Sequence, residues 1–331
     1  MNTKNFLFFI GIDISKKMFD VSIIQEGRTT SYVFENSKKG INSFIRLLKN
    51  QKIPLEDTLI CMEHTGVYGK LIITKLVEKQ AHFCVEMPIK ITRSIGVHRG
   101  KNDKVDAQRI AQYAFKNHNE LVLYQPLPEV LEQVKILLKI RRKLVNTRAD
   151  INKYPNELEI FSPELGKLAK NNLKKINKSL CDEIDRIEGG IKKLILSDNR
   201  LNKTIGLVTS VTGIGQITAL HFTVFTNFFT KYENPNQLAC YCGVVPFEYT
   251  SGSSVFRKSR IHPMANRTLK KHLHMSALAA INHDPDIRAY FQRKVEEGKN
   301  KMLIINNVRN KLVHRICAVI KRQEPYVKNL A

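Results

Sequence analysis

Hydrophobic and polar positions alternate in two different ways over the first 117 residues. Apolar runs rich in β-branched and aromatic residues predict five strands, at about 6–12, 19–26, 30–35, 58–62 and 82–87. Helical periodicity predicts one helix capped by Ser37, one over about 67–79 and one over about 103–117. Strands that alternate with helices predict a mixed sheet with helices packed on it, so the first part of the chain belongs to the α/β class.

The rest of the chain has mainly helical periodicity. Two or more long polar helices are predicted between about 129 and 193, with interruptions at Pro155 and at Ser162–Pro163, and they suggest a helical arm or coiled-coil hairpin. Three later helices are predicted at 266–282, 286–297 and 300–322. We therefore predict three parts: an α/β domain at 1–125, a helical linker region at 126–203 and a mainly helical C-terminal domain at 204–331.

The net charge of the chain indicates its binding partner more clearly than its composition does. The 331 residues include 54 Lys and Arg against 30 Asp and Glu, a formal net charge of +24. Such a surface repels itself unless a polyanion neutralises it, so nucleic acid is the leading partner. No apolar run approaches the roughly 20 residues of a membrane span, and no membrane partner is expected. The cysteines show no secreted-framework spacing, which predicts reduced thiols and hence a cytoplasmic protein.

The positive charge is greatest in the C-terminal domain. Between Tyr249 and His283 there is no acidic residue, and six cations fall in that stretch: Arg257, Lys258, Arg260, Arg267, Lys270 and Lys271. A solvated basic face is the simpler interpretation, but an acid-free stretch of this length favours contact with nucleic-acid phosphates. Lys101 is a further candidate contact. A zinc site from Cys240, Cys242, His272 and His274 is disfavoured, because the C-x-C spacing is tighter than usual.

Four carboxylates stand at positions where they can converge. Asp13 and Glu63 each follow a predicted buried strand, and Asp103 and Asp106 are three apart on one helix face. Oxygen ligands of this kind suit Mg²⁺, with Mn²⁺ as the alternative, and such ions support phosphoryl transfer. The structural alternative is that Asp103 only caps its helix and that Asp106 pairs with Lys101 or Arg109.

These residues lie in strings that resemble the DEDD transposases of the insertion sequence 110 family, also called Piv/MooV-like recombinases. The matching strings in the first domain are GIDIS around Asp13, EHTGVY around Glu63, and KNDKVDAQRIA around Asp103 and Asp106. Further along the chain, VTGIGQITAL resembles the helix-hairpin-helix segment of that family, and NQLACYCGVVPFEYTSGSS resembles the start of its second catalytic region. One departure is Ala265–Asn266, where the family usually has Gly-Asn.

The resemblance implies a fold, a site and partners. The first domain would have a ribonuclease H-like (RuvC-like) fold with Asp13, Glu63, Asp103 and Asp106 as a metal-binding tetrad. Ser251 would be the nucleophile by motif position, with Ser253 and Ser254 as alternatives. The protein would join donor and target DNA under the guidance of a structured non-coding bridge RNA, as a homodimer or homotetramer.

Three other functions remain open at this point. A Piv-like DNA invertase would have the same residues as a transposase. A RuvC-like, structure-specific nuclease would use the carboxylates without the serine. A non-catalytic nucleic-acid-binding protein would have the same charge with purely structural carboxylates. A covalent protein–DNA adduct separates a recombinase from a nuclease, because only a protein nucleophile leaves one.

Overall fold

The computed structural model describes residues 5–95, 103–232, 234–251 and 255–327, with side chains except at 95, 103–104, 247–251 and 255–260. The chain divides into two compact units, Met1–Pro126 and Leu127–Ala331, and each is described by itself. Apart from Pro126, the predicted helical region 126–203 falls within the second unit, together with 204–331. None of the helices described is long and apolar enough to cross a membrane.

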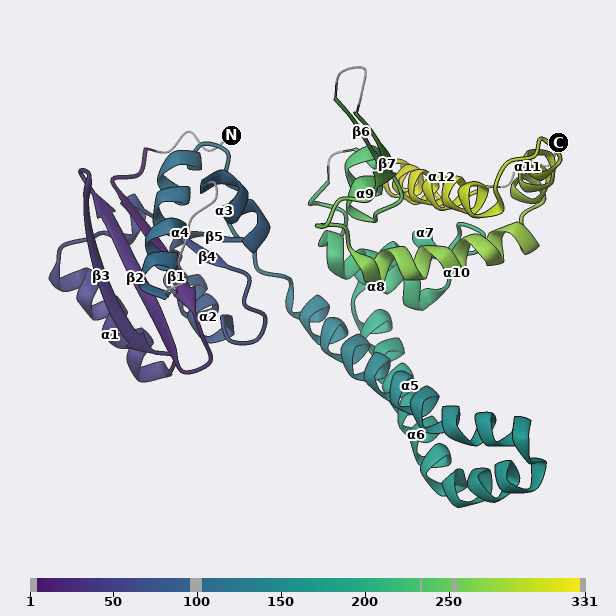
Figure 1. The fold of residues 1–331 in the computed structure, drawn as a ribbon. Coiled ribbons are helices and arrows are strands. Elements are labelled where there is room, and N and C mark those ends of the chain that lie inside the picture. Colours follow the sequence, from purple (N-terminus) through teal and green to yellow (C-terminus); the bar gives the residue numbers. More distant parts are fainter. Residues whose placement is uncertain (1–4, 96–102, 233, 252–254, 328–331) are drawn as a thin grey trace. The chain divides into compact units, whose positions relative to one another are not determined.

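The first unit is built on the five predicted strands. These are β1 (Phe8–Ile14), β2 (Met18–Gln25), β3 (Arg28–Glu35), β4 (Thr58–Glu63) and β5 (His82–Glu86). They form one sheet in the order β3-β2-β1-β4-β5 (Figure 1). The pairs β1–β2 and β2–β3 are antiparallel, whereas β1–β4 and β4–β5 are parallel. The prediction of a mixed α/β domain is confirmed.

Helices cover both faces of this sheet. They are α1 (Lys38–Asn50), α2 (Lys70–Glu78), α3 (Pro88–Ile95) and α4 (Asp103–Asn117), with a short 3-10 turn, η1 (Leu55–Asp57). Phe44 of α1 and Leu76 of α2 pack in one apolar cluster with alternate strand residues, while Ile91 of α3 and Ile110 of α4 pack in a second cluster on the opposite face. Ser37 caps α1 as predicted, because its hydroxyl accepts a hydrogen bond from the Gly40 amide at 3.1 Å.

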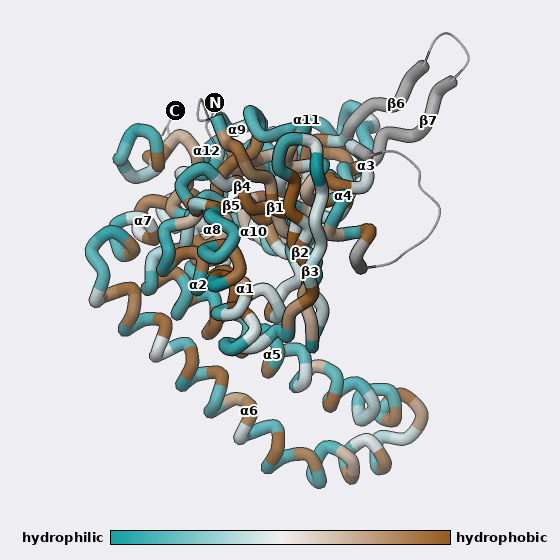
Figure 2. The backbone as a smooth tube through the Cα atoms, turned by 90° about the vertical axis from the view of Figure 1, so that its left-hand side faces the viewer, coloured by the Kyte–Doolittle hydropathy of each residue, from teal (hydrophilic) through white to brown (hydrophobic). Residues whose placement is uncertain are grey.

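The second unit begins with a long helical hairpin of α5 (Glu129–Phe161) and α6 (Pro163–Ser197) (Figure 1). Ser162 caps α6 and Pro163 opens it, so the predicted interruption there is confirmed. The predicted interruption at Pro155 is wrong, since α5 continues through this buried proline. Packing on α6 offsets the cost of the lost hydrogen bond, about 3 kcal/mol in a helix interior. Figure 2 shows hydrophobic and hydrophilic residues alternating along α6.

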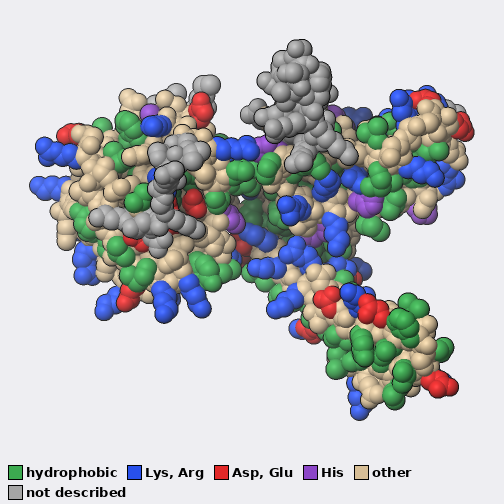
Figure 3. Space-filling view, in the orientation of Figure 1, with side chains coloured by type: hydrophobic (Ala, Val, Ile, Leu, Met, Phe, Trp, Pro, Cys, Tyr) green, Lys and Arg blue, Asp and Glu red, His purple; other side chains and the backbone are tan. Residues whose placement is uncertain are grey.

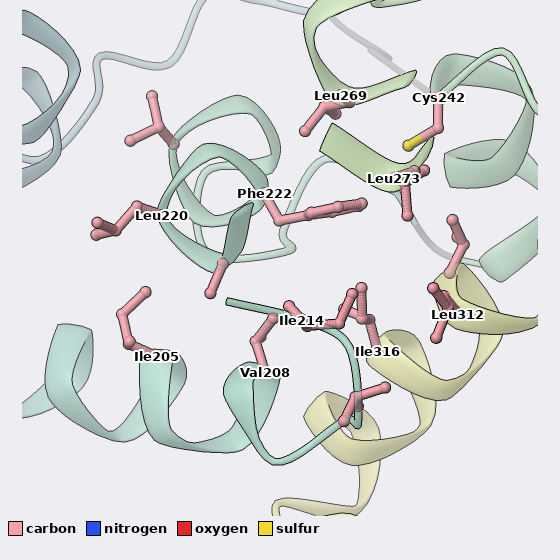
Figure 4. Packing of buried hydrophobic residues seen from close by; sticks show 14 of the residues in the cluster. Ile205, Val208, Ile214, Leu220, Phe222, Cys242, Leu269, Leu273, Leu312 and Ile316 are labelled. Atoms are coloured by element: carbon pink, nitrogen blue, oxygen red, sulfur yellow. The ribbon is translucent and has the colours of Figure 1, made fainter. Parts of the chain in front are cut away.

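The remaining elements enclose the core of the second unit. They are α7 (Asn199–Thr209), α8 (Gln216–Thr226), α9 (Pro235–Tyr241), the hairpin strands β6 (Phe247–Ser251) and β7 (Val255–Arg260), α10 (Arg267–His283), α11 (Pro285–Glu296) and α12 (Lys301–Arg322). Val208, Phe222, Leu273 and Leu312, from four different helices, point toward one another in this core (Figure 4). The three predicted C-terminal helices are confirmed, and the β6–β7 hairpin is an element that the sequence pattern did not predict.

Candidate active site

The sheet register sets Asp13 beside Glu63. The parallel pairing of β1 with β4 aligns Ile12 with Met62, so the next residue of each strand lies opposite the other. Neighbouring strands are about 4.8 Å apart, and residues in register point to the same face. Both side chains are partly buried. The two strand-end carboxylates of the first unit are therefore neighbours, as the sequence predicted for adjacent strands.

Two further acids extend this pair across the sheet. Asp20 of β2 is in register with Asp13, and Glu86 of β5 is in register with Glu63. We call these four residues, on four consecutive strands, the acidic row. Glu86 is only 7% exposed, and its carboxylate accepts from the Lys90 ammonium at 2.8 Å. Asp20 and Glu86 were not predicted as site residues, although Glu86, near the end of the HFCVEM strand, was a visible signal.

Helix α4 lies on the same face of the sheet and runs opposite to β1. A methyl group on Gly11 would be 2.2 Å from the backbone oxygen of Ala107, so the helix backbone rests directly on this strand. Nearer the start of β1, the Phe9 ring meets the ring of Phe115 with centroids 5.1 Å apart. The first turn of α4, which begins at Asp103, is consequently directed toward the end of β1 that carries Asp13.

Asp106 is held by a cation in this arrangement. Its Oδ1 atom accepts from Arg109 Nη1 at 2.8 Å, and both side chains are about a quarter exposed. This is one of the two pairings that the structural alternative foresaw. The Asp103 side chain and Lys101 lie outside the described residues. Among the side chains that are described, no three of His, Cys, Asp and Glu lie close enough to hold a metal ion, the cysteines and histidines considered for zinc included.

The negative charge of the acidic row shifts the pKa values of buried groups near it. The pKa of the Cys61 thiol is raised well above its usual value by its hydrogen bond with Cys84, by burial and by the charges of Glu86 and Glu63. Burial, followed by Glu86, raises the pKa of the Tyr113 phenol. The field around this edge of the sheet therefore disfavours any further anion and favours a cation.

The predicted serine belongs to the second unit. Ser251 is the last residue of β6 and pairs with Val255 at the start of β7, so it lies at the distal end of this hairpin. Its side chain and those of Arg257, Lys258 and Arg260 lie outside the described ones, as do Ser253 and Ser254 entirely. The chain enters the next helix by a well-defined turn: Asn266 caps α10, and its amide donates to the Tyr241 carbonyl at 2.7 Å. Ala265 is thus accommodated where the family usually has glycine.

Helix α10 carries the described cations of the acid-free stretch. Arg267 and Lys271 are exposed, while Lys270 is half-buried. Histidines on neighbouring helices lie nearby, with the rings of His221 and His272 separated by 4.3 Å between centroids. Burial lowers the pKa of His221 to about 3, assisted by His272 and by Arg142 and Arg141 of α5. These two arginines could not be predicted from the sequence, because α5 meets α8 only after folding. Lys and Arg side chains are spread over the visible face of the molecule (Figure 3).

Comparisons with known proteins match regions in both units of the chain. A transposase model of the IS110 DEDD type matches residues 10–161, and a model of the IS116/IS110/IS902 transposase family matches residues 206–292. The pilin gene-inverting protein of Moraxella bovis is 25% identical over 326 residues, which cover 97% of this chain and 98% of that protein. The transposase for insertion sequence element IS1111A of Coxiella burnetii is 24% identical over 345 residues, covering 96% and 90%. The chain belongs to the IS110 family of transposases and is a DNA transposase or recombinase.

Proposed function

We propose that this protein cuts and joins DNA by metal-dependent phosphoryl transfer, with the tetrad Asp13, Glu63, Asp103 and Asp106 as its metal site and Ser251 as its nucleophile. The observation that carries the proposal is the register that sets Asp13 beside Glu63, with the first turn of α4 directed toward them. The sheet order, covered by helices on both faces, is compatible with a ribonuclease H-like, RuvC-like domain. Both regions lie in parts of the chain that match transposase family models, which supports their combination in one enzyme.

The donor set fits a hard divalent cation. Carboxylate oxygens are the ligands that Mg²⁺ prefers, and Mn²⁺ accepts the same ones. The ion pair with Arg109 engages the Oδ1 atom of Asp106, and the acidic row favours positive charge at this edge. When bound, Mg²⁺ would lower the pKa of an attacking hydroxyl and stabilise the leaving oxygen. Arg109 would hold the Asp106 carboxylate in position.

The serine chemistry is a transesterification that needs no external energy. The Ser251 oxygen forms a bond to a DNA phosphorus while the bond from that phosphorus to the neighbouring nucleotide breaks. The hydroxyl proton leaves to a base, and the departing nucleotide oxygen takes up a proton. A DNA hydroxyl then attacks the serine ester, which rejoins the strand and releases the serine.

The partners follow from the same proposal. Donor and target DNA would both be bound, and a structured guide RNA would select them, consistent with the charge of +24. The tetrad lies in the first unit and Ser251 in the second, so a homodimer or homotetramer could combine them from different chains. DNA inversion is the second candidate reaction, favoured by the pilin gene-inverting relative that matches almost the whole chain.

An adduct assay tests the mechanism. Wild-type protein is incubated with Mg²⁺, the element's flanking DNA and its adjoining RNA, and protein linked to DNA is detected on denaturing gels. Ser251→Ala should abolish the adduct and retain DNA binding, whereas Ser253→Ala and Ser254→Ala serve as matched controls that keep it. Asp13→Asn and Glu63→Gln should also abolish it while thermal unfolding stays unchanged.

Each other outcome supports a different function. Adduct formation by Ser251→Ala would assign the nucleophile to another residue. Cleavage by the wild type without any adduct would make water the nucleophile and the protein a nuclease. Full cleavage by both carboxylate variants would show that these acids are structural.

A further inference from the structure

Arg309 of α12 is a buried guanidinium without a carboxylate partner among the described residues. It is only 6% exposed, and its Nε atom has no hydrogen-bond partner among the side chains and backbone groups that the structure describes. Its Nη2 atom lies 2.5 Å from His274 Nδ1, and its Nη1 atom lies 3.5 Å from Asn306 Oδ1. Both contacts are to neutral groups. An arginine cannot shed its proton to escape this environment, so the charge is compensated only weakly.

The surroundings of Arg309 add positive charge instead of removing it. Neither α10 nor α12 contains any acidic residue, although Asp284 directly after α10 pairs with Arg315 at 2.6 Å. The charge of Arg309 lowers the pKa of Lys270 and of His274, after the larger effect of burial in each case. The side chains of Lys270 and His274 therefore add no negative charge at Arg309, and the Asp284 carboxylate is engaged by Arg315.

The hydrogen bond to Arg309 also fixes which nitrogen of His274 is a donor. Arg309 can only donate, so Nδ1 of His274 must accept. The neutral ring then carries its proton on Nε2. This Nε2–H group lies on the far side of the ring from Arg309, so the donors left for an oxyanion are the unpartnered Arg309 Nε and the Lys270 ammonium, and charged donors of this kind suit a phosphate.

This cluster adjoins the segment that leads into the serine hairpin. Asn306 donates to the Val244 carbonyl at 2.7 Å, which ties α12 to this segment. A methyl group on Gly243 would lie 3.6 Å from Lys270 Cδ, so the lysine stem lies against the same segment. Strand β6 begins three residues after Val244 and ends at Ser251. The cluster is thus at the base of the hairpin that carries the proposed nucleophile.

We infer that Arg309 and Lys270, with His274 holding the Arg309 guanidinium in place, form a binding site for a backbone phosphate of the DNA strand that the serine hairpin engages. The inference rests on the proposed function for the identity of the strand, and on the uncompensated charge for the anion. A bound phosphodiester would supply the negative charge that Arg309 lacks, and it would fix one phosphate beside the base of β6. Within this site Arg309 is a positioning residue.

Inorganic phosphate is the first probe. Thermal unfolding of the full-length protein is measured in phosphate and in chloride at equal ionic strength. At about five times the dissociation constant, phosphate should raise the Tm of the wild type by about 2–4 °C. Arg309→Met should lose this rise and should unfold in chloride at the wild-type temperature or higher, because a buried unpaired charge has been removed. Lys270→Gln, at a partly exposed position, should weaken the rise.

The matched control is Lys311→Gln. It removes one positive charge from the same helix, but Lys311 is exposed and lies over the Tyr290 ring, 4.4 Å from its centroid. The control should keep the wild-type phosphate response. A lower Tm of Arg309→Met in chloride, with the phosphate response retained, would show that Arg309 is structural and would overturn the inference.

DNA is the second probe. The log–log dependence of DNA affinity on salt should become shallower by about 0.9 in Arg309→Met, the value for one lost phosphate contact. An unchanged slope would refute the assignment to DNA. The adduct assay separates this inference from the proposed function: an Arg309-dependent phosphate response without any serine adduct would leave the site standing and the mechanism wrong. Adduct formation without a phosphate response would support the serine mechanism and refute the phosphate site.

Discussion

Gly11 sets how closely α4 approaches the sheet, and its replacement by alanine is the most informative single change in the first unit. The added methyl carbon would lie 2.2 Å from the Ala107 oxygen and 2.2 Å from the Ala111 nitrogen, both of them backbone atoms. Ordinary van der Waals contact begins at 3.4 Å. Helix α4 must therefore move away from β1 by about 1 Å, and overpacking of this kind typically costs about 1–3 kcal/mol.

The same displacement changes the spacing of the candidate metal ligands. Asp103 and Asp106 would move with α4, while Asp13 and Glu63 would stay with the sheet. A misplacement of about 1 Å can cost about 10²-fold in rate. We expect Gly11→Ala to lower the free energy of unfolding by 1–3 kcal/mol and to slow DNA cleavage by about 10²-fold, with DNA affinity nearly unchanged.

Urea unfolding followed by circular dichroism, together with single-turnover cleavage in Mg²⁺, measures both effects. Gly189→Ala is the matched control, because Gly189 lies in α6 and its new methyl group would contact nothing within 4 Å. That substitution should stabilise the helix by about 0.5–1 kcal/mol and leave the rate alone. Wild-type stability of Gly11→Ala would refute the close packing of α4 on β1. Lost stability with an unchanged rate would refute the role of this helix in positioning the acids.

Two further predictions concern charge. DNA affinity should fall steeply with salt, with a log–log slope of about −0.9 for each phosphate neutralised, and a flat salt dependence would contradict this. Neutralising Arg257, Lys258, Lys270 and Lys271 together should weaken binding to all DNA sequences alike. Burial lowers the pKa of His221 to about 3 from 6.5 in the unfolded chain, so the unfolded state binds more protons between these values and stability decreases as the pH is lowered from 6.5 toward 3. The loss by pH 5 should be about 2 kcal/mol in urea titrations, and His221→Phe should abolish most of it; an equal loss in that variant would assign the effect elsewhere.

Features decided within a few residues were predictable from the sequence. The Ser37 cap and the start of α6 at Ser162–Pro163 depend on local hydrogen bonds and on the fixed φ of proline, and both are confirmed. The predicted helix break at Pro155 was wrong because its outcome depends on tertiary packing. Its effect depends on how firmly α5 is packed on α6, and no local pattern reveals that packing.

The candidate site divides in the same way. Acids at strand ends were visible in the sequence, and the neighbouring positions of Asp13 and Glu63 needed only adjacent parallel strands. Asp20 entered the acidic row through an antiparallel pairing whose register the sequence did not reveal. Arg309 meets His274 across 35 positions and two helices, so tertiary packing alone brings them together. The β6–β7 strands had suitable aromatic and β-branched residues, but their polar serines and glycine favoured a turn.

The boundary between Pro126 and Leu127 has a genetic consequence. Because the candidate acids and Ser251 lie in separately compact units, either set can be inactivated without disturbing the folding of the other. A cell that makes one chain without its acids and another without its serine would then carry two intact half-sites. If a working centre draws its halves from different subunits, the two defective genes should complement each other. If both halves come from one chain, the mixture should be as inactive as either parent.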